Sequence, residues 1–242
     1  MTNTGDPAEG PADVTVLFSR LAADGGVLDT ETRTATGLAP GATATGRIDL
    51  DGRPTSRPGD VATGPLGPIR TTPGAARQVK VSKVRSVPTA EAPRPGGPCP
   101  ASGLRLYADE GDAAMGLRVM GLHLRNCGDS TVTVNGYPRL QPLDLKHRPI
   151  DGVRVLSGGA AIASGTGADN PPQEIALRPG EGARTTLVWR NTAEAGSDPV
   201  NATYLRVRAG EGAAPVMLTP ELDLGTTGRL GVGAWAREDD RS

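Results

Sequence analysis

Short stretches in which apolar and polar residues alternate run through most of the chain. Near its start, Val14, Val16 and Phe18 recur at every second position, the period of a strand with one buried face. After residue 98, eight such stretches lie between Gly- and Pro-containing turns: 104–108, 117–126, 131–135, 139–145, 174–177, 184–190, 204–208 and 215–218. Half-polar strands need a facing sheet to bury their apolar sides. The pattern therefore predicts an all-β fold, an Ig-like antiparallel β-sandwich, with no helix.

Composition divides the 242 residues into four parts. Residues 1–51 contain strand patterns separated by turns, and they predict a partial second β-sandwich unit. Residues 52–98 are rich in Pro and Gly and carry eight basic against two acidic side chains, which predicts a basic linker. Within it, Val79, Val81 and Val84 could add an edge strand. Residues 99–236 predict a complete sandwich, and residues 237–242 a charged tail.

Two short motifs occur twice, in the same order. Asn-x-Gly-Asp begins at Asn3 and at Asn126, and Leu-x-Pro-Gly-x-x-Ala begins at Leu38 and at Leu177. Each match alone is weak because such turns are common, but together they indicate two related units. In the second unit 27 residues precede Asn126, whereas two residues precede Asn3. We therefore expect the chain to begin within a domain, with opening strands and a targeting signal encoded upstream.

The two cysteines, Cys99 and Cys127, are 28 positions apart in the β-rich part of the chain. This placement suits a disulfide, which persists in oxidising compartments and would stabilise the fold by roughly 3.5 kcal/mol through loop closure. Two buried thiols in a cytosolic protein are the alternative. The sequence has neither a signal-peptide pattern nor an apolar stretch long enough to form a transmembrane segment. The cysteine pair nevertheless predicts an extracytoplasmic location.

Little in the sequence suggests catalysis or cofactor binding. The net charge of −1 lacks the basic excess of nucleic-acid-binding proteins. His123 is expected to face solvent from its strand, His147 lies in a basic turn, and neither has a nucleophile at motif spacing. The Cys and His spacings fit no zinc site, and the acidic turn 109–112 lacks the calcium-loop pattern. We expect no metal, no cofactor and no enzymatic activity.

Three aromatic residues are candidates for ligand contact: Tyr137, Trp189 and Trp235. Such a cluster could form a platform on which sugar rings stack. Trp189 shares a strand face with Leu187, however, so a role as a core anchor is the stronger interpretation. Tyr137 is expected to pack under its turn. Residues 157–172 have no strand pattern and predict a long surface loop, which is the expected binding surface.

Five sequence blocks point to a known family: CPASGLRLY, GDAAMGLRVMGLHLRNCG, VNGYPRLQPLD, LRPGEGARTTLVWRN and DLGTTGRLGVGAW. Over about 99–236 they resemble the actinobacterial family called domain of unknown function 4232. The resemblance implies an Ig-like β-sandwich in secreted, lipoprotein or membrane-anchored envelope proteins, with no established activity and no catalytic residues. Many members place the second cysteine just before the Gly-Tyr-Pro element, where this chain has Val132, whereas Cys127 lies on the preceding turn.

These observations predict a non-enzymatic extracytoplasmic binding or architectural module of the cell envelope. Its expected partner is a cell-wall polymer or another envelope protein. Two alternatives remain open, a carbohydrate-binding module and an accessory domain of a hydrolase or a cryptic hydrolase.

Overall fold

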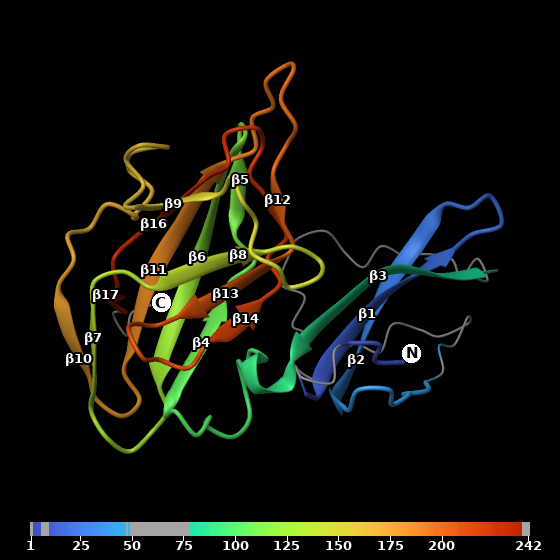
Figure 1. Ribbon diagram of the computed structural model, residues 1–242, viewed down its shortest axis with the longest axis horizontal. Helices are drawn as coiled ribbons and strands as arrows, with labels where there is room; N and C mark the ends of the chain where they lie inside the picture. The colour runs from blue at the N-terminus through green and yellow to red at the C-terminus, as the bar shows by residue number, and fades with distance from the viewer. Residues whose placement is uncertain (1, 6–9, 47, 49–77, 239–242) are drawn as a thin grey trace, which may run out of the picture. The chain divides into compact units, whose positions relative to one another are not determined.

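The computed structural model describes residues 2–5, 10–46, 48 and 78–238 (Figure 1). The chain forms two compact units, Met1–Thr89 and Ala90–Ser242. Strands make up both units, and the one helical element among the described residues is the 3-10 turn η2, Thr89–Glu91. The prediction of an all-β fold is confirmed.

The described part of the first unit is a single antiparallel sheet of three strands, in the order β2-β1-β3. These strands are β1 (Ala12–Leu21), β2 (Val27–Leu38) and β3 (Gln78–Pro88). β1 is central, and its Val14 and Val16 are buried, as their alternation predicted. Asp24 closes the β1–β2 hairpin by accepting a 2.9 Å hydrogen bond from the backbone N–H of Gly26.

β3 corrects the predicted linker. It lies inside residues 52–98, yet it pairs with β1 along its whole length, from Ala12–Pro88 to Leu21–Gln78. The possible edge strand at Val79, Val81 and Val84 is therefore confirmed, since β3 lies at an edge of the sheet. The assignment of these residues to a linker followed the proline-rich composition around them. Residues 52–77 of the predicted linker lie outside the described residues.

The second unit contains one large sheet and several smaller ones. The large sheet has the order β4-β6-β11-β16-β9, with β5 beside β6 and β17 beside β11. Its strands are β4 (Leu104–Ala108), β5 (Asp112–Ala114), β6 (Leu117–Asn126), β9 (Arg154–Ser157), β11 (Gly182–Arg190), β16 (Arg229–Val232) and β17 (Ala236–Arg237). β16 and β9 pair in parallel, a departure from the purely antiparallel prediction.

The smaller sheets supply the facing layer and the ends of this unit. One has the order β14-β13-β8, and the other two are the pairs β10-β7 and β12-β15. Their strands are β7 (Val132–Asn135), β8 (Arg139–Leu143), β10 (Glu174–Leu177), β12 (Asn201–Ala202), β13 (Tyr204–Arg208), β14 (Val216–Leu218) and β15 (Leu222–Asp223). The result is the sandwich-like arrangement that the strand pattern predicted.

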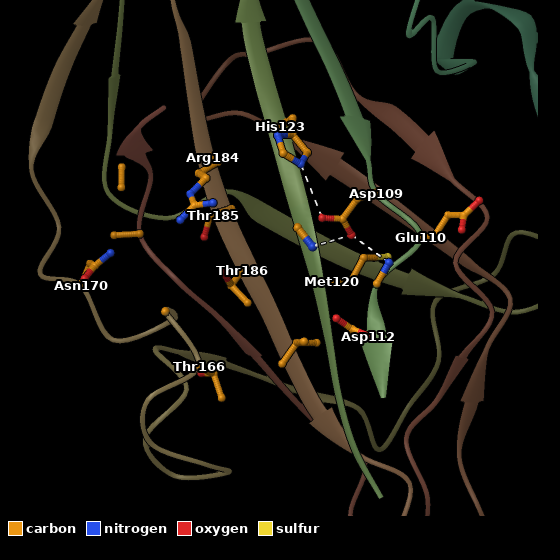
Figure 2. Close-up of a pocket in the computed structure, with 16 residues that line it drawn as sticks. Asp109, Glu110, Asp112, Met120, His123, Thr166, Asn170, Arg184, Thr185 and Thr186 are labelled. Atoms are coloured by element: carbon orange, nitrogen blue, oxygen red, sulfur yellow. Dashed lines mark hydrogen bonds and ion pairs between the residues drawn. The ribbon is translucent and has the colours of Figure 1, made fainter. Parts of the chain in front are cut away.

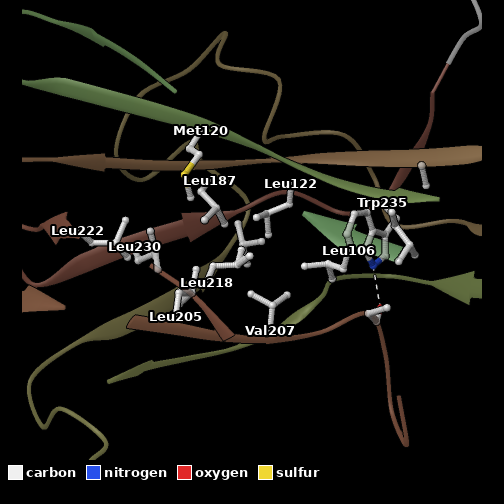
Figure 3. Close-up of a cluster of buried hydrophobic side chains, with 14 of the residues drawn as sticks. Leu106, Met120, Leu122, Leu187, Leu205, Val207, Leu218, Leu222, Leu230 and Trp235 are labelled. Atoms are coloured by element: carbon white, nitrogen blue, oxygen red, sulfur yellow. Dashed lines mark hydrogen bonds between the residues drawn. The ribbon is translucent and has the colours of Figure 1, made fainter. Parts of the chain in front are cut away.

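One hydrophobic cluster joins the two layers of the second unit (Figure 3). Leu122 and Leu187 of the large sheet face Leu205 and Val207 of the β14-β13-β8 sheet, and all four side chains are fully buried. Trp235 is also fully buried, and its indole N–H donates a 2.8 Å hydrogen bond to the carbonyl oxygen of Ala209. Buried tryptophans usually have such a partner, although Nε1 of Trp189 has none among the described residues.

The repeated Asn motif of the second unit forms a clasp between the end of β6 and the turn after β10. The side-chain amide of buried Asn126 donates to the Leu177 carbonyl at 2.8 Å, and its Oδ1 accepts from the Gly128 N–H at 3.1 Å. Its backbone N–H donates to the Glu181 carbonyl at 2.9 Å, and its carbonyl accepts from the Gly180 N–H at 2.8 Å.

Asn3 makes the same four bonds in the first unit. Its amide donates to the Leu38 carbonyl at 2.8 Å, and its Oδ1 accepts from the Gly5 N–H at 2.9 Å. Its backbone N–H donates to the Ala42 carbonyl at 2.9 Å, and its carbonyl accepts from the Gly41 N–H at 2.8 Å. The two repeated motifs therefore build one local structure twice.

A disulfide joins Cys99 to Cys127, with the Cα atoms 5.6 Å apart. Cys127 follows β6 directly, and its backbone N–H donates a 2.9 Å hydrogen bond to the carbonyl of Gly103, just before β4. The bond therefore fixes the lead into β4 against the end of β6. The unusual position of the second cysteine does not prevent the pairing.

Candidate functional site

A groove of about 510 Å³ lies on the outer face of β6 and β11, the face turned away from the core (Figure 2). Cross-strand neighbours form its floor: Gly121 of β6 pairs with Thr186 of β11, and His123 pairs with Arg184. One wall is the turn between β4 and β5, residues 109–112. The other is the loop after β9, which contributes Thr166, Gly167 and Asn170. We call this hollow the β6–β11 groove.

Gly121 opens the floor of the groove. The outward positions of β6 otherwise carry side chains, among them Val119 and His123. A Cβ atom at Gly121 would lie only 2.2 Å from Oδ2 of Asp109. Because the glycine leaves this space free, the Asp109 carboxylate reaches over β6, and its Oδ1 accepts hydrogen bonds from the N–H groups of Gly121 and Gly111, both at 2.9 Å.

His123 lies at the edge of the groove between two carboxylates. Its Nε2 is 3.5 Å from Oδ2 of Asp109, and its Nδ1 is 2.9 Å from Oε1 of Glu238. The ring of Tyr107 stacks on it, with centroids 5.0 Å apart and planes inclined by 9°. The side chain is therefore on the predicted outer face but is only 19% exposed, so the expectation of a solvent-facing residue is wrong. Both ring nitrogens face acidic groups.

The end of the chain holds one of these carboxylates. Residues 237–242 were expected to be a charged tail, yet β17 pairs with β11 through Ala236 and Arg237. Arg237 donates a 2.7 Å bond to Glu181 and a 2.6 Å bond to the Ala176 carbonyl. The N–H of Arg178 and then the Arg237 guanidinium lower the pKa of the Glu181 carboxyl. Arg237 and Glu238 are thus held beside β11, and residues 239–242 lie outside the described residues.

The loop predicted at 157–172 forms the second wall and is anchored at its base. Oδ1 of Asp169 accepts hydrogen bonds from the N–H groups of Gly159, at 2.8 Å, and Ala160, at 2.7 Å. Ala168 beside it is fully buried. These contacts hold Thr166, Gly167 and Asn170 at the groove.

Charged groups of opposite sign line the groove without pairing. Glu110 and Asp112 are exposed on the β4–β5 wall, and Arg184 is exposed on β11. Within the described residues, none of the three forms an ion pair or a side-chain hydrogen bond, and neither does Asn170 on the opposite wall. The same part of the chain contains no group of three or more His, Cys, Asp or Glu side chains placed to hold a metal ion.

The three aromatic candidates lie outside the groove. Trp189 and Trp235 belong to the core cluster, with exposed fractions of 8% and 0%. A buried ring offers no face to a sugar, so a stacking platform built on the two tryptophans is wrong, and the shared face of Trp189 and Leu187 pointed correctly to the core. Tyr137 is half-buried and packs against the same cluster.

The family model described as "Domain of unknown function (DUF4232)" matches residues 99–236, more than half of the chain. Every residue that lines the β6–β11 groove lies within this range. Neither a curated protein nor a solved structure matches the chain.

Proposed function

The chain belongs to the family DUF4232, and we propose that it is a non-catalytic binding module of the cell envelope whose ligand occupies the β6–β11 groove. The observation that carries the proposal is the groove itself, a hollow with polar walls and unpaired charged groups on a rigid sheet. Binding sites are typically concave and contain a few polar groups that converge on the ligand. The expected partner is a cell-wall polymer or another envelope protein.

A binding role accounts for the groove better than hydrolysis does. A general base needs a nitrogen or oxygen atom within reach of the proton that it removes. Both nitrogens of His123 face Asp109 or Glu238, and the ring of His147 packs edge-on against Tyr204, with centroids 4.6 Å apart. Neither histidine is therefore placed to act as a general base, which disfavours a histidine-dependent hydrolase, and the unpaired charged groups suit recognition of a ligand.

An extracytoplasmic location is supported by the Cys99–Cys127 disulfide, because such bonds persist in oxidising compartments. Among the described residues, no helix is long and apolar enough to cross a membrane. Trp189 and Trp235 are buried and offer no stacking surface to a carbohydrate. A sugar would therefore have to be held by the polar groups of the groove alone.

The proposal predicts that the purified protein cosediments with an insoluble cell-wall preparation from the organism that encodes it. Replacing Arg184 by alanine should weaken this binding at least fivefold, because it removes an unpaired cation from the groove. Gly121→Val should do the same by forcing the Asp109 carboxylate from its place. Arg125→Ala is the matched control, since Arg125 is exposed on the same face of β6 but does not line the groove.

Equal binding by the Arg184 and Arg125 variants would show that the ligand does not occupy the groove. Release of soluble fragments from the wall during incubation would favour the hydrolase alternative. Circular dichroism and thermal unfolding of each variant separate loss of binding from loss of fold.

A further inference from the structure

We propose that the part of the wall polymer or envelope protein that enters the β6–β11 groove is dipolar, a short peptide segment with one ammonium group, which lies at Glu110 and Asp112, and one carboxylate, which lies at Arg184. This inference rests on the proposed function and adds the chemical class of the ligand to it. The observation behind it is the separation of unpaired acidic and basic groups across one groove.

The acidic end of the groove is the β4–β5 wall. Glu110 and Asp112 are exposed there, and within the described residues no cation pairs with either. Asp109 differs from them, because it faces His123 and holds the N–H groups of Gly111 and Gly121. Asp109 therefore builds the wall, while its two neighbours are available to a ligand cation.

The basic end lies on β11. Arg184 is exposed beside His123, which is its cross-strand neighbour, yet the carboxylates around His123 face the imidazole ring. The side-chain amide of Asn170, on the loop wall, has no hydrogen-bond partner among the described residues. A guanidinium and an amide donor together suit a carboxylate, which accepts several hydrogen bonds at once.

The register of the strands gives the distance between the two ends. Arg184 pairs with His123, and Asp112 pairs with Val119, so they are two strand spacings and four residues apart. With about 4.8 Å between strands and about 3.3 Å per residue, their Cα atoms are about 10 Å apart across the sheet and about 13 Å apart along it. The direct distance between the two Cα atoms is therefore about 16 Å, and this is the gap that a ligand must bridge. The long arginine side chain is flexible, and the gap shortens when it reaches along the groove. A single amino acid is too short to bridge it, whereas an extended tripeptide spans about 10 Å.

The same arrangement disfavours other ligand classes. A simple anion would contact only Arg184 and a simple cation only the acidic wall, so each would use one end of the groove. A neutral sugar could use the hydroxyl and amide groups but would leave the charged ends uncompensated. A dipolar ligand alone satisfies both ends.

Titration of the full chain with tri-alanine, followed by NMR, tests this inference. Tri-alanine carries charge only at its ends, so N-acetylation removes the ammonium charge and C-terminal amidation removes the carboxylate charge. At low salt each modification should weaken binding about three- to fivefold, as expected for exposed ion pairs, and added salt should reduce the difference. Arg184→Ala should abolish the effect of amidation and retain that of acetylation. The double variant Glu110→Gln/Asp112→Asn should give the reverse pattern.

Arg125→Ala and Glu174→Gln are the matched controls, since both change an exposed charge outside the groove. Equal affinity for tri-alanine and its two capped forms would overturn the dipolar ligand. Shifts of the groove amides with a neutral trisaccharide and none with tri-alanine would also overturn it, while leaving the groove as a binding site. If neither Arg184→Ala nor Gly121→Val weakens binding to the cell wall in the cosedimentation experiment, the proposed function itself is wrong.

Discussion

Replacing Trp235 by alanine is expected to lower the free energy of unfolding of the second unit by about 3–5 kcal/mol. Trp235 is fully buried where the two layers meet, so its removal leaves a large cavity among leucines and valines. It also leaves the carbonyl of Ala209 without the 2.8 Å bond from the indole N–H. Urea denaturation followed by circular dichroism measures the loss.

Trp235→Phe separates the two contributions. It retains part of the ring volume but removes the indole donor. We expect its free energy of unfolding to lie between those of the wild type and Trp235→Ala. A change below about 1 kcal/mol in the alanine variant would show that the side chain is not part of the core.

The double replacement Cys99→Ala/Cys127→Ala is expected to cost about 3.5 kcal/mol of stability, because the unfolded chain gains the entropy that the closed loop removes. The loop has a sequence separation of 28 residues and encloses β4, β5 and all of β6. Urea denaturation of the oxidised wild type and of the double variant measures the difference.

Reduction provides the matched control for the cysteine variant. Dithiothreitol should destabilise the wild type by a similar amount and should leave the double variant unchanged, since that variant has no cysteine. Equal stability of oxidised and reduced wild type would show that the bond contributes little to the fold.

The alternation of apolar residues predicted the strands well. It located the core positions of β6 and β11 and the burial of Val14 and Val16, because strand faces follow directly from sequence order. The Asn clasp was also visible as a repeated motif, and each of its two copies makes the same four hydrogen bonds within its own unit. The valines of β3 also indicated an edge strand, but the proline-rich sequence around them placed the segment in the linker.

The groove could not be predicted in the same way, because its parts come from distant segments. Asp109, His123 and Glu238 meet only after β4, β6 and β17 have folded, and 115 positions separate His123 from Glu238. The parallel pairing of β9 with β16 likewise depends on a long crossover. Two local signals were present: the loop predicted at residues 157–172, which forms one wall, and Gly121, a gap in a strand face that otherwise carries bulky side chains.

Amide hydrogen exchange of the full chain with and without solubilised cell-wall fragments tests the central claim most directly. If the β6–β11 groove receives the ligand, binding will slow exchange in residues 109–112 and 166–170, the two walls, and at Gly121 between them. The two wall segments consist mainly of exposed residues in turns and loops, so protection there reports contact and not a general gain in stability. Protection confined to the β14-β13-β8 sheet or to the first unit would contradict the account, and so would the absence of any change.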